Sequence, residues 1–260
     1  MSEESERSIH RALPPVRGRP SPLRGVPGFL GRPIWREARS IRELRLLKES
    51  PLWQGHSIPE GHGRPVLLIA GFLAGPRTID ALDHVLQVAG WEVRQATVGR
   101  NAGPAYRGIL HCEENLHQLH ESGEKVRVIG HSRGGQYARI LAVRFPALVD
   151  QVITLGAPLL IKYPSYAVVK VPAEALDRLW RVGTFGSVDV EAEARVDADR
   201  FAPFPPDVDF VSIYSRSDGI VDWRTSLDPA AVAVAVDASH AGLPNSIAGV
   251  TAVAAALRRR

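Results

Sequence analysis

Three residues of the chain, Ser132, Asp218 and His240, have the types and the order that nucleophilic catalysis requires. A serine hydroxyl is a weak nucleophile at neutral pH. A neutral imidazole must therefore take its proton during attack and later return it to the leaving group. A carboxylate holds that imidazole in the correct tautomer and stabilises the imidazolium that forms. The order serine, acid, histidine along the chain is one of the known orders of such a triad.

Ser132 lies in the middle of a G-x-S-x-G pentapeptide, Gly130-His131-Ser132-Arg133-Gly134. The preceding run, Lys125–Ile129, alternates polar and β-branched residues as a strand does. The following run, Gly135–Ala142, is rich in good helix formers. A serine at such a strand-to-helix turn is held in strained backbone geometry with its hydroxyl exposed, so the pattern predicts a nucleophile.

The acid and the histidine each follow a predicted strand. Asp218 lies in a turn just after the expected strand Val208–Ser215, and His240 follows the apolar strand Ala231–Val236. His240 is the only histidine on the C-terminal side of the serine. Asp222 is a rival for the role of the acid. We favour Asp218 because it is nearer to the strand end, and we expect Asp222 to be an exposed loop carboxylate.

The negative oxygen of a tetrahedral intermediate needs N–H donors that are already in place, and one such donor lowers the barrier by about 3 kcal/mol. One donor is the backbone N–H of Arg133, which follows the serine. The second is expected after an early strand, where the apolar run Pro65–Ala70 leads into Gly71 and Phe72. We therefore assign the second donor to the Phe72 N–H, although Gly71 alone is also consistent with an ordinary strand-to-loop glycine.

With these residues in place, the chain from about Pro65 to Leu257 resembles the bacterial lipase and esterase branch of the α/β-hydrolase superfamily. The segments that match in order and spacing are Gly99–Pro104, Gly130–Gly135, Ile153–Pro158, Ser217–Trp223 and Ser239–Leu243. The resemblance implies an α/β-hydrolase fold, a triad of Ser132, Asp218 and His240, and oxyanion donors at Phe72 and Arg133.

Two positions depart from the family's pattern. The chain has Ala70-Gly71 where the family usually has His-Gly, and Arg133 where the family usually has a small or apolar residue. Both oxyanion donors are backbone groups, so neither departure removes them. We expect the Arg133 side chain to reach a carboxylate inside the protein; an acidic group of the substrate is the alternative.

The body alternates strands with helices, which predicts an α/β protein with a mostly parallel sheet and helices on both faces. The pattern breaks over residues 159–207, where only Ala173–Val182 is helix-like. Because sites in this architecture lie at the carboxyl ends of the strands, we expect this insertion to form a cap over the serine. The residues expected to contact the substrate lie beside the triad or in the cap. They are Leu73, His131, Leu159, Tyr163 and Tyr166.

The N-terminal part differs from the rest, and we divide the chain into an arm of residues 1–50 and a hydrolase-like domain of residues 51–260. The arm carries eleven Lys or Arg and six Asp or Glu, a charge of +5, whereas residues 51–260 sum to −1, so the net charge of +4 comes from the arm. Its segment Trp35–Glu49 predicts a helix with one apolar side, formed with Ile34, Ile41, Leu44 and Leu47. Docking on the body or on a second subunit is the favoured role, and contact with an anionic membrane is the alternative.

Composition excludes several classes of protein. Hydrophobic content of 45% and charged content of 23% are typical of a globular protein. A single cysteine, Cys112, excludes an internal disulfide framework, and we expect neither a metal nor another cofactor. The arm is basic, but it has no motif or aromatic pattern for nucleic acid. No apolar run has the form of a signal peptide or of a membrane span, which favours a cytoplasmic location.

The resemblance implies a serine carboxylester hydrolase, an esterase or lipase acting on an ester with an apolar group. Acyl transfer to another acceptor, or thioester or amide hydrolysis, would use the same residues. A non-catalytic binding protein that kept the fold is the remaining alternative, and a complete triad in the correct order argues against it.

Overall fold

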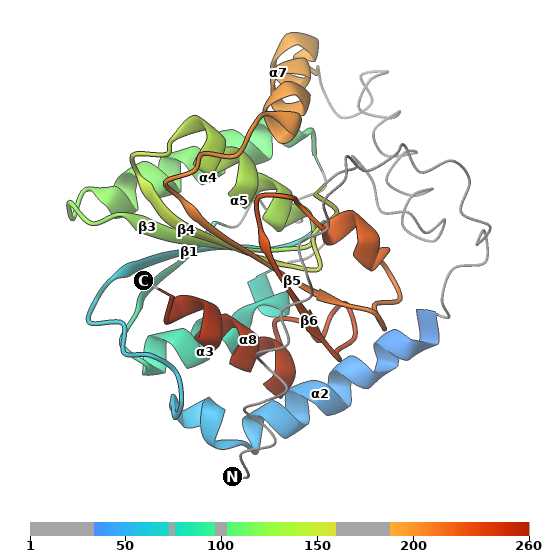
Figure 1. Ribbon diagram of the computed structural model, residues 1–260. Helices are drawn as coiled ribbons and strands as arrows, with labels where there is room; N and C mark the ends of the chain where they lie inside the picture. Colours follow the sequence, from blue (N-terminus) through green and yellow to red (C-terminus); the bar gives the residue numbers. More distant parts are fainter. Residues whose placement is uncertain (1–33, 73–75, 97–102, 160–187, 260) are drawn as a thin grey trace.

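The structure is a computed structural model that describes residues 34–72, 76–96, 103–159 and 188–259 (Figure 1). Its centre is a sheet of six strands in the order β2-β1-β3-β4-β5-β6, and every neighbouring pair is parallel. The strands are β1 (Pro65–Ile69), β2 (Glu92–Ala96), β3 (Val126–His131), β4 (Val149–Leu155), β5 (Asp209–Ser215) and β6 (Val232–Val236). The expected mostly parallel α/β sheet is thus confirmed.

Strand β1 explains why a continuous apolar run is needed at the centre of the sheet. Val66 and Leu68 point into one hydrophobic core, and Leu67 and Ile69 point into the other. A strand covered on both faces by helices has no solvent side, so its residues do not alternate between apolar and polar. The two cores make three layers, with the sheet in the middle.

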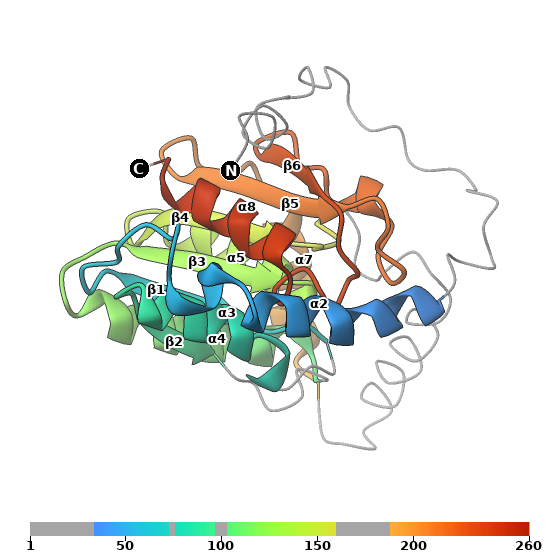
Figure 2. The same cartoon turned by 90° about the horizontal axis from the view of Figure 1, so that it is seen from below.

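The helices divide between the two faces of the sheet. Figures 1 and 2 show α3 (Asp80–Val88) and α8 (Ile247–Leu257) on one face, and α4 (Ala105–His120) and α5 (Arg133–Arg144) on the other. α8 is apolar around most of its circumference because it lies between the sheet and α2. Among the described residues, every helix is too short or too polar to cross a lipid bilayer.

One helix inside the expected cap was not predicted. α7 (Val190–Phe201) begins at Asp189, whose side chain accepts the N–H of Ala192, and it packs against α4 and α5. Buried Arg139 of α5 donates to the carbonyls of Arg200 and Ala202 at its other end. Within residues 159–207, α7 therefore packs on the helices α4 and α5 that cover one face of the sheet. Residues 160–187, with the expected helix Ala173–Val182, lie outside the described residues.

The N-terminal segment forms a short 3-10 helix, η1 (Ile34–Ala38), which continues into α2 (Arg39–Lys48). α2 lies against α8 and against the short helix η2 (Pro51–Gln54), and Leu47 is fully buried there. Trp35 and Ile41 are on the outer side, with exposed fractions of 75% and 77%. One side of the segment therefore docks on the body, and two of its large apolar residues face away.

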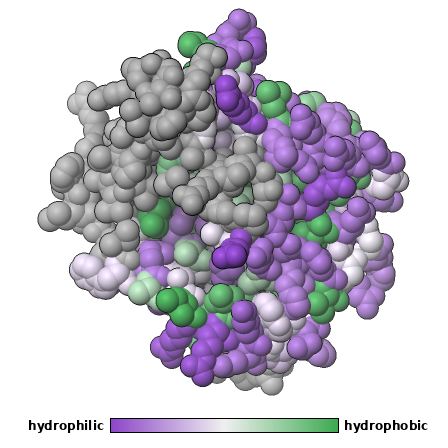
Figure 3. All heavy atoms as spheres, turned by 180° about the vertical axis from the view of Figure 1, so that it is seen from behind, coloured by the Kyte–Doolittle hydropathy of each residue, from purple (hydrophilic) through white to green (hydrophobic). Residues whose placement is uncertain are grey.

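Hydrophobic residues on the surface do not gather in a single patch on the side opposite to that of Figure 1. Figure 3 shows them scattered among hydrophilic residues over the coloured part of that face. Single exposed apolar residues are normal on a globular protein.

Candidate active site

Ser132 occupies a strained turn between β3 and α5. Its backbone has φ 55° and ψ −124°, and it is one of three residues other than glycine with a positive φ among those described. A side chain at such a position is unfavourable unless the surrounding structure holds it there. The serine N–H donates to the carbonyl of Leu155 at the end of β4 (2.8 Å). The strand-turn-helix geometry predicted around Ser132 is present.

The glycines of the pentapeptide are required by close approach of the backbone. A Cβ atom on Gly134 would overlap the carbonyl oxygen of Ile69 in β1, and one on Gly130 would overlap the backbone of Gly134. A larger residue at either position would push the turn away from its neighbouring strands. The turn can therefore close tightly enough to present the serine at the strand ends.

His240 is paired with Asp218. Nδ1 of the imidazole lies 2.7 Å from Oδ2 of the carboxylate, and both side chains are buried. The other carboxylate oxygen accepts the backbone N–H groups of Ile220 (2.8 Å) and Val221 (2.7 Å). These donors fix the orientation of the carboxylate. Asp218 therefore directs Nδ1–H toward itself and leaves Nε2 as the ring nitrogen that can accept a proton.

Burial disfavours the imidazolium form of His240. The charge and hydrogen bond of Asp218, together with the charge of Glu37, outweigh that penalty and raise the pKa of His240 above its ordinary value. The environment thus stabilises a protonated imidazole, which is the species that a general base becomes when it takes a proton.

His131, the residue before the serine, contacts both the backbone and the ring of His240. Its Nε2 donates to the carbonyl of His240 (3.0 Å), and the centroids of the two rings are 4.7 Å apart. Burial and, secondly, the neighbouring His240 lower the pKa of His131 to about 3, so its ring is neutral at neutral pH. His131 was expected to contact substrate, but its ring is buried against His240.

The serine and the acid–base pair meet around the end of β4. Ser132 is hydrogen-bonded to Leu155, and a Cβ atom on the next residue, Gly156, would lie 3.2 Å from both Asp218 Oδ2 and His240 Nδ1. Ser132, Asp218 and His240 follow β3, β5 and β6. They lie at the same end of the sheet because the carboxyl ends of parallel strands are on the same side.

The residues predicted to carry the oxyanion donors are next to the serine in space or in the chain. A Cβ atom on Gly71 would be 2.9 Å from Ser132 Cβ and 3.4 Å from its Oγ, so the peptide that leads into Phe72 runs against the serine. Arg133 is the first residue of α5, so its N–H lies at the positive end of the helix dipole.

The Arg133 side chain folds back over the protein. Its guanidinium donates to the carbonyl of Gly103 (2.9 Å) and lies over the rings of Phe72 (5.6 Å) and Tyr137 (5.4 Å). It thus links the loop after β1 to the start of α5. These contacts are within the protein, as expected for the internal role of Arg133.

The other expected substrate residues have different outcomes. Leu159 is fully buried in the core beneath α4 and α5. Leu73, Tyr163 and Tyr166 lie outside the described residues.

The expectation that Asp222 is an exposed loop carboxylate was wrong. Asp222 is buried, with an exposed fraction of 4%, and it begins the short helix η4 (Trp223–Ser226). Its carboxylate accepts the N–H of Arg224 (3.1 Å), as a helix-capping aspartate does. Burial of Asp222 thus comes from capping, and the carboxylate that contacts His240 is that of Asp218.

No family model and no curated protein matches the chain, but many solved structures do. The first of three such structures is a metagenomic carboxyl esterase, which is 14% identical (TM-score 0.54; 79% of this chain and 80% of the other). The second was reported with the metagenome-derived lipolytic enzymes LipS and LipT and is 17% identical (TM-score 0.50; 71% and 88%). The third, a Bacillus licheniformis lipase, is 13% identical (TM-score 0.50; 72% and 89%).

The chain has the α/β-hydrolase fold. The family resemblance inferred from its motifs is therefore confirmed at the level of the fold. Ser132 lies in the turn between β3 and α5 of this fold. Among the described residues, no group of three His, Cys, Asp or Glu side chains is placed to hold a metal ion.

Sequence reasoning missed two carboxylates beside this α/β-hydrolase site, Glu37 of η1 and Glu43 of α2. Both accept hydrogen bonds from the loop that carries His240. A signal was present in the amphipathic pattern: Glu37 is seven residues before Leu44, and Glu43 is four before Leu47, so both acids share the apolar side of the segment. Acids on that side are expected to have buried partners.

Proposed function

We propose that the chain is a serine hydrolase of carboxylic esters that acts through an acyl-serine intermediate. One observation supports this proposal most strongly. Ser132, in its strained turn, lies at the carboxyl ends of the strands, as does the buried pair of His240 and Asp218. The esterases and lipases that share the fold agree with this chemistry.

In the first half of the proposed reaction, Oγ of Ser132 attacks the ester carbonyl carbon while Nε2 of His240 takes its proton. The C–O bond to the alcohol then breaks, and the imidazolium returns the proton to the departing alcohol. In the second half, water replaces the alcohol in the reverse sequence and releases the acid. Asp218 stabilises the imidazolium in both halves.

The N–H groups of Phe72 and Arg133 are proposed to stabilise the oxyanion of each tetrahedral intermediate. Donors of this kind act because they are held in place before the charge develops, and each contributes about 3 kcal/mol. The packing of Gly71 against Ser132 and the position of Arg133 at the first residue of α5 support this assignment.

The nucleophile is tested by labelling with an organophosphonate, followed by mass spectrometry of the digested protein. We expect the adduct on the peptide that contains Ser132. Ser132→Ala should lose the label and nearly all ester turnover while keeping the wild-type melting temperature. Ser122→Ala, at a serine after α4 and away from the site, is the matched control and should keep both. Labelling elsewhere or an active Ser132→Ala variant would refute the proposal.

The reaction class is tested with p-nitrophenyl esters of short and long acyl chains, acyl-thioesters, and an added alcohol or amine acceptor. Preference for the esters, with the free acid as product, supports ester hydrolysis. Faster thioester cleavage, or transfer of the acyl group to the acceptor, would keep Ser132 as nucleophile but reassign the substrate. We propose an apolar group on the ester, as expected from the sequence.

A further inference from the structure

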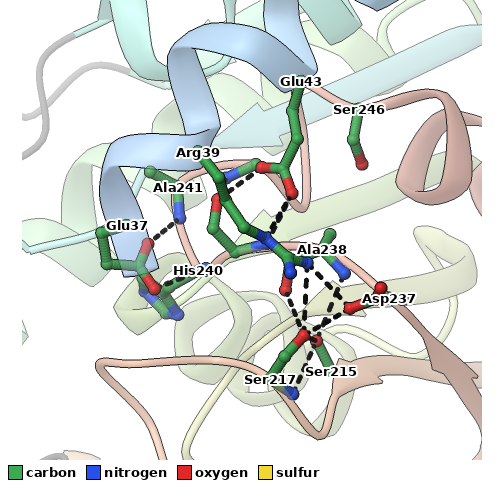
Figure 4. A network of polar contacts seen from close by, with 12 residues as sticks. Glu37, Arg39, Glu43, Ser215, Ser217, Asp237, Ala238, His240, Ala241 and Ser246 are labelled. Atoms are coloured by element: carbon green, nitrogen blue, oxygen red, sulfur yellow. Dashed lines mark hydrogen bonds and ion pairs between the residues drawn. The ribbon is translucent and has the colours of Figure 1, made fainter. Parts of the chain in front are cut away.

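One carboxylate joins the loop of the acid to the loop of the histidine. Oε1 of Glu37 accepts the N–H of Gly219 (2.9 Å), next to Asp218. The same oxygen accepts the N–H of His240 (3.1 Å), and Oε2 accepts the N–H of Ala241 (3.0 Å) (Figure 4). Glu37 precedes His240 by 203 residues, so this contact depends on the docking of η1.

The backbone of His240 is therefore held from both sides. Glu37 accepts its N–H, and His131 donates to its carbonyl (3.0 Å). Its imidazole is held by Asp218 (2.7 Å). With both the backbone and Nδ1 fixed, Nε2 of the same ring has little freedom to move. General-base catalysis requires that kind of restraint, because it depends on the position of the accepting nitrogen.

A second carboxylate repeats the arrangement one residue earlier in the loop. Glu43 accepts from the N–H (3.0 Å) and the hydroxyl (2.5 Å) of Ser239. Arg39 is ion-paired with both Glu43 (2.8 Å) and Asp237 (2.8 Å) (Figure 4). Asp237 is at the start of the loop that carries His240, so Arg39 attaches the segment to that end of the loop. Three side chains of one N-terminal segment thus hold residues 237–241.

Two glycines have no side chain where the carboxylates of Glu37 and Glu43 approach the backbone. A Cβ atom on Gly219 would lie 3.0 Å from Oε1 of Glu37, and one on Gly242 would overlap the carboxylate of Glu43. The close fit at two separate points indicates that the segment and the loops are packed as one unit.

Glu37 also adds a negative charge beside a group that becomes positive during catalysis. The titratable side chains that face His240 are Asp218 after β5, His131 at the end of β3 and Glu37 in η1. His131 is neutral and contributes no charge. Two carboxylates therefore stabilise the imidazolium, and Glu37 is the one that no triad pattern includes.

We propose that Glu37 is a positioning residue of the active site, which holds the acid loop and the histidine loop together and stabilises the protonated form of His240. This inference rests on the proposed function. It makes the N-terminal segment 34–48 part of the catalytic apparatus, with Glu43 and Arg39 as its second point of attachment.

The test is the second-order rate of organophosphonate labelling of Ser132, measured from pH 5 to 9, since it does not depend on knowing the substrate. Glu37→Ala removes both the hydrogen bonds and the charge. In Glu37→Gln, one amide oxygen still accepts from Gly219 and His240, but the charge is lost. Glu49→Ala is the matched control, because Glu49 follows the same segment and, among the described residues, its ion pair is the local one with Arg45. Melting temperatures show that each variant is folded.

We expect Glu37→Ala to label about 10- to 100-fold more slowly, the size of loss that follows misplacement of a catalytic group. Glu37→Gln should regain most of the rate at high pH, with its acid limb moved to lower pH. On an ester that the protein turns over, kcat should fall more than KM rises. If Glu37→Ala fails to fold, the pH shift in Glu37→Gln carries the test.

A wild-type rate for Glu37→Ala overturns the positioning role, and an unmoved acid limb for Glu37→Gln overturns the stabilisation of protonated His240 by Glu37. Absence of label on Ser132 in the wild-type protein would instead refute the proposed function, so the two failures are distinguishable.

Discussion

Asp218 Oδ2 lies 2.7 Å from His240 Nδ1, whereas Asp222, four residues further on, caps η4. The two buried carboxylates therefore have separate tasks, although both lie in the loop between β5 and β6. One orients the histidine, and the other begins a helix.

This separation predicts opposite outcomes for two conservative variants. Asp218→Asn should lower kcat by about four orders of magnitude, because the amide favours the wrong tautomer of the histidine. Asp222→Asn should keep kcat within a few-fold, since asparagine is also a good helix cap. Ester turnover, normalised to the folded fraction from circular dichroism, checks both. The reverse ranking would move the acid to Asp222.

The pKa of His240 sets the acid limb of the pH profile. Burial opposes the imidazolium, but Asp218 and Glu37 together raise the pKa above its ordinary value of about 6.5. The base must be neutral to accept a proton, so kcat/KM should rise with pH through a midpoint higher than that value. A midpoint below it, measured between pH 5 and 9 on a small acetate ester, would contradict this assignment.

The turn at Ser132 and the contact between Asp218 and His240 agree with the geometry expected from the sequence, because the signals for them are local. A strand, a turn with glycines and a helix lie within about twenty residues of Ser132, and each constrains the backbone directly. Asp218 and His240 follow strands, and the sheet order then brings them together. The expected strands Val208–Ser215 and Ala231–Val236 are present as β5 and β6, each beginning one residue later than expected.

Long-range contacts account for what was missed. Nothing near Glu37 in the chain indicates that its partners are Gly219 and His240, since those contacts exist only after η1 docks. Asp222 resembled a loop residue because its burial depends on how η4 packs. α7 had a weak apolar pattern, and its packing on α4 and α5 and its contacts with Arg139 stabilise it in the fold.

His131 predicts a specific loss of stability in acid. Its pKa is about 3 in the folded protein and near 6.5 when unfolded, so below pH 6.5 the unfolded state binds a proton that the folded state does not. Its contribution to stability is complete above pH 6.5 and is lost progressively down to about pH 3. The free energy of unfolding in urea should therefore fall less between pH 7 and pH 4.5 in His131→Asn than in the wild type. Equal losses in the two proteins would contradict the assignment.

The docking of α2 is tested by two apolar residues of that helix with opposite environments. Leu47 is fully buried against the body, so Leu47→Ala should lower the free energy of unfolding by about 2–5 kcal/mol. Ile41 is 77% exposed, and Ile41→Ala should change it by no more than about 0.5 kcal/mol. Urea unfolding of both variants measures the difference.

Flotation with phosphatidylserine vesicles tests whether the outer side of the segment, where Trp35 is exposed, binds a membrane. If Leu47→Ala is as stable as the wild type while Trp35→Ala abolishes flotation, the segment is a membrane device and the docking interpretation is wrong.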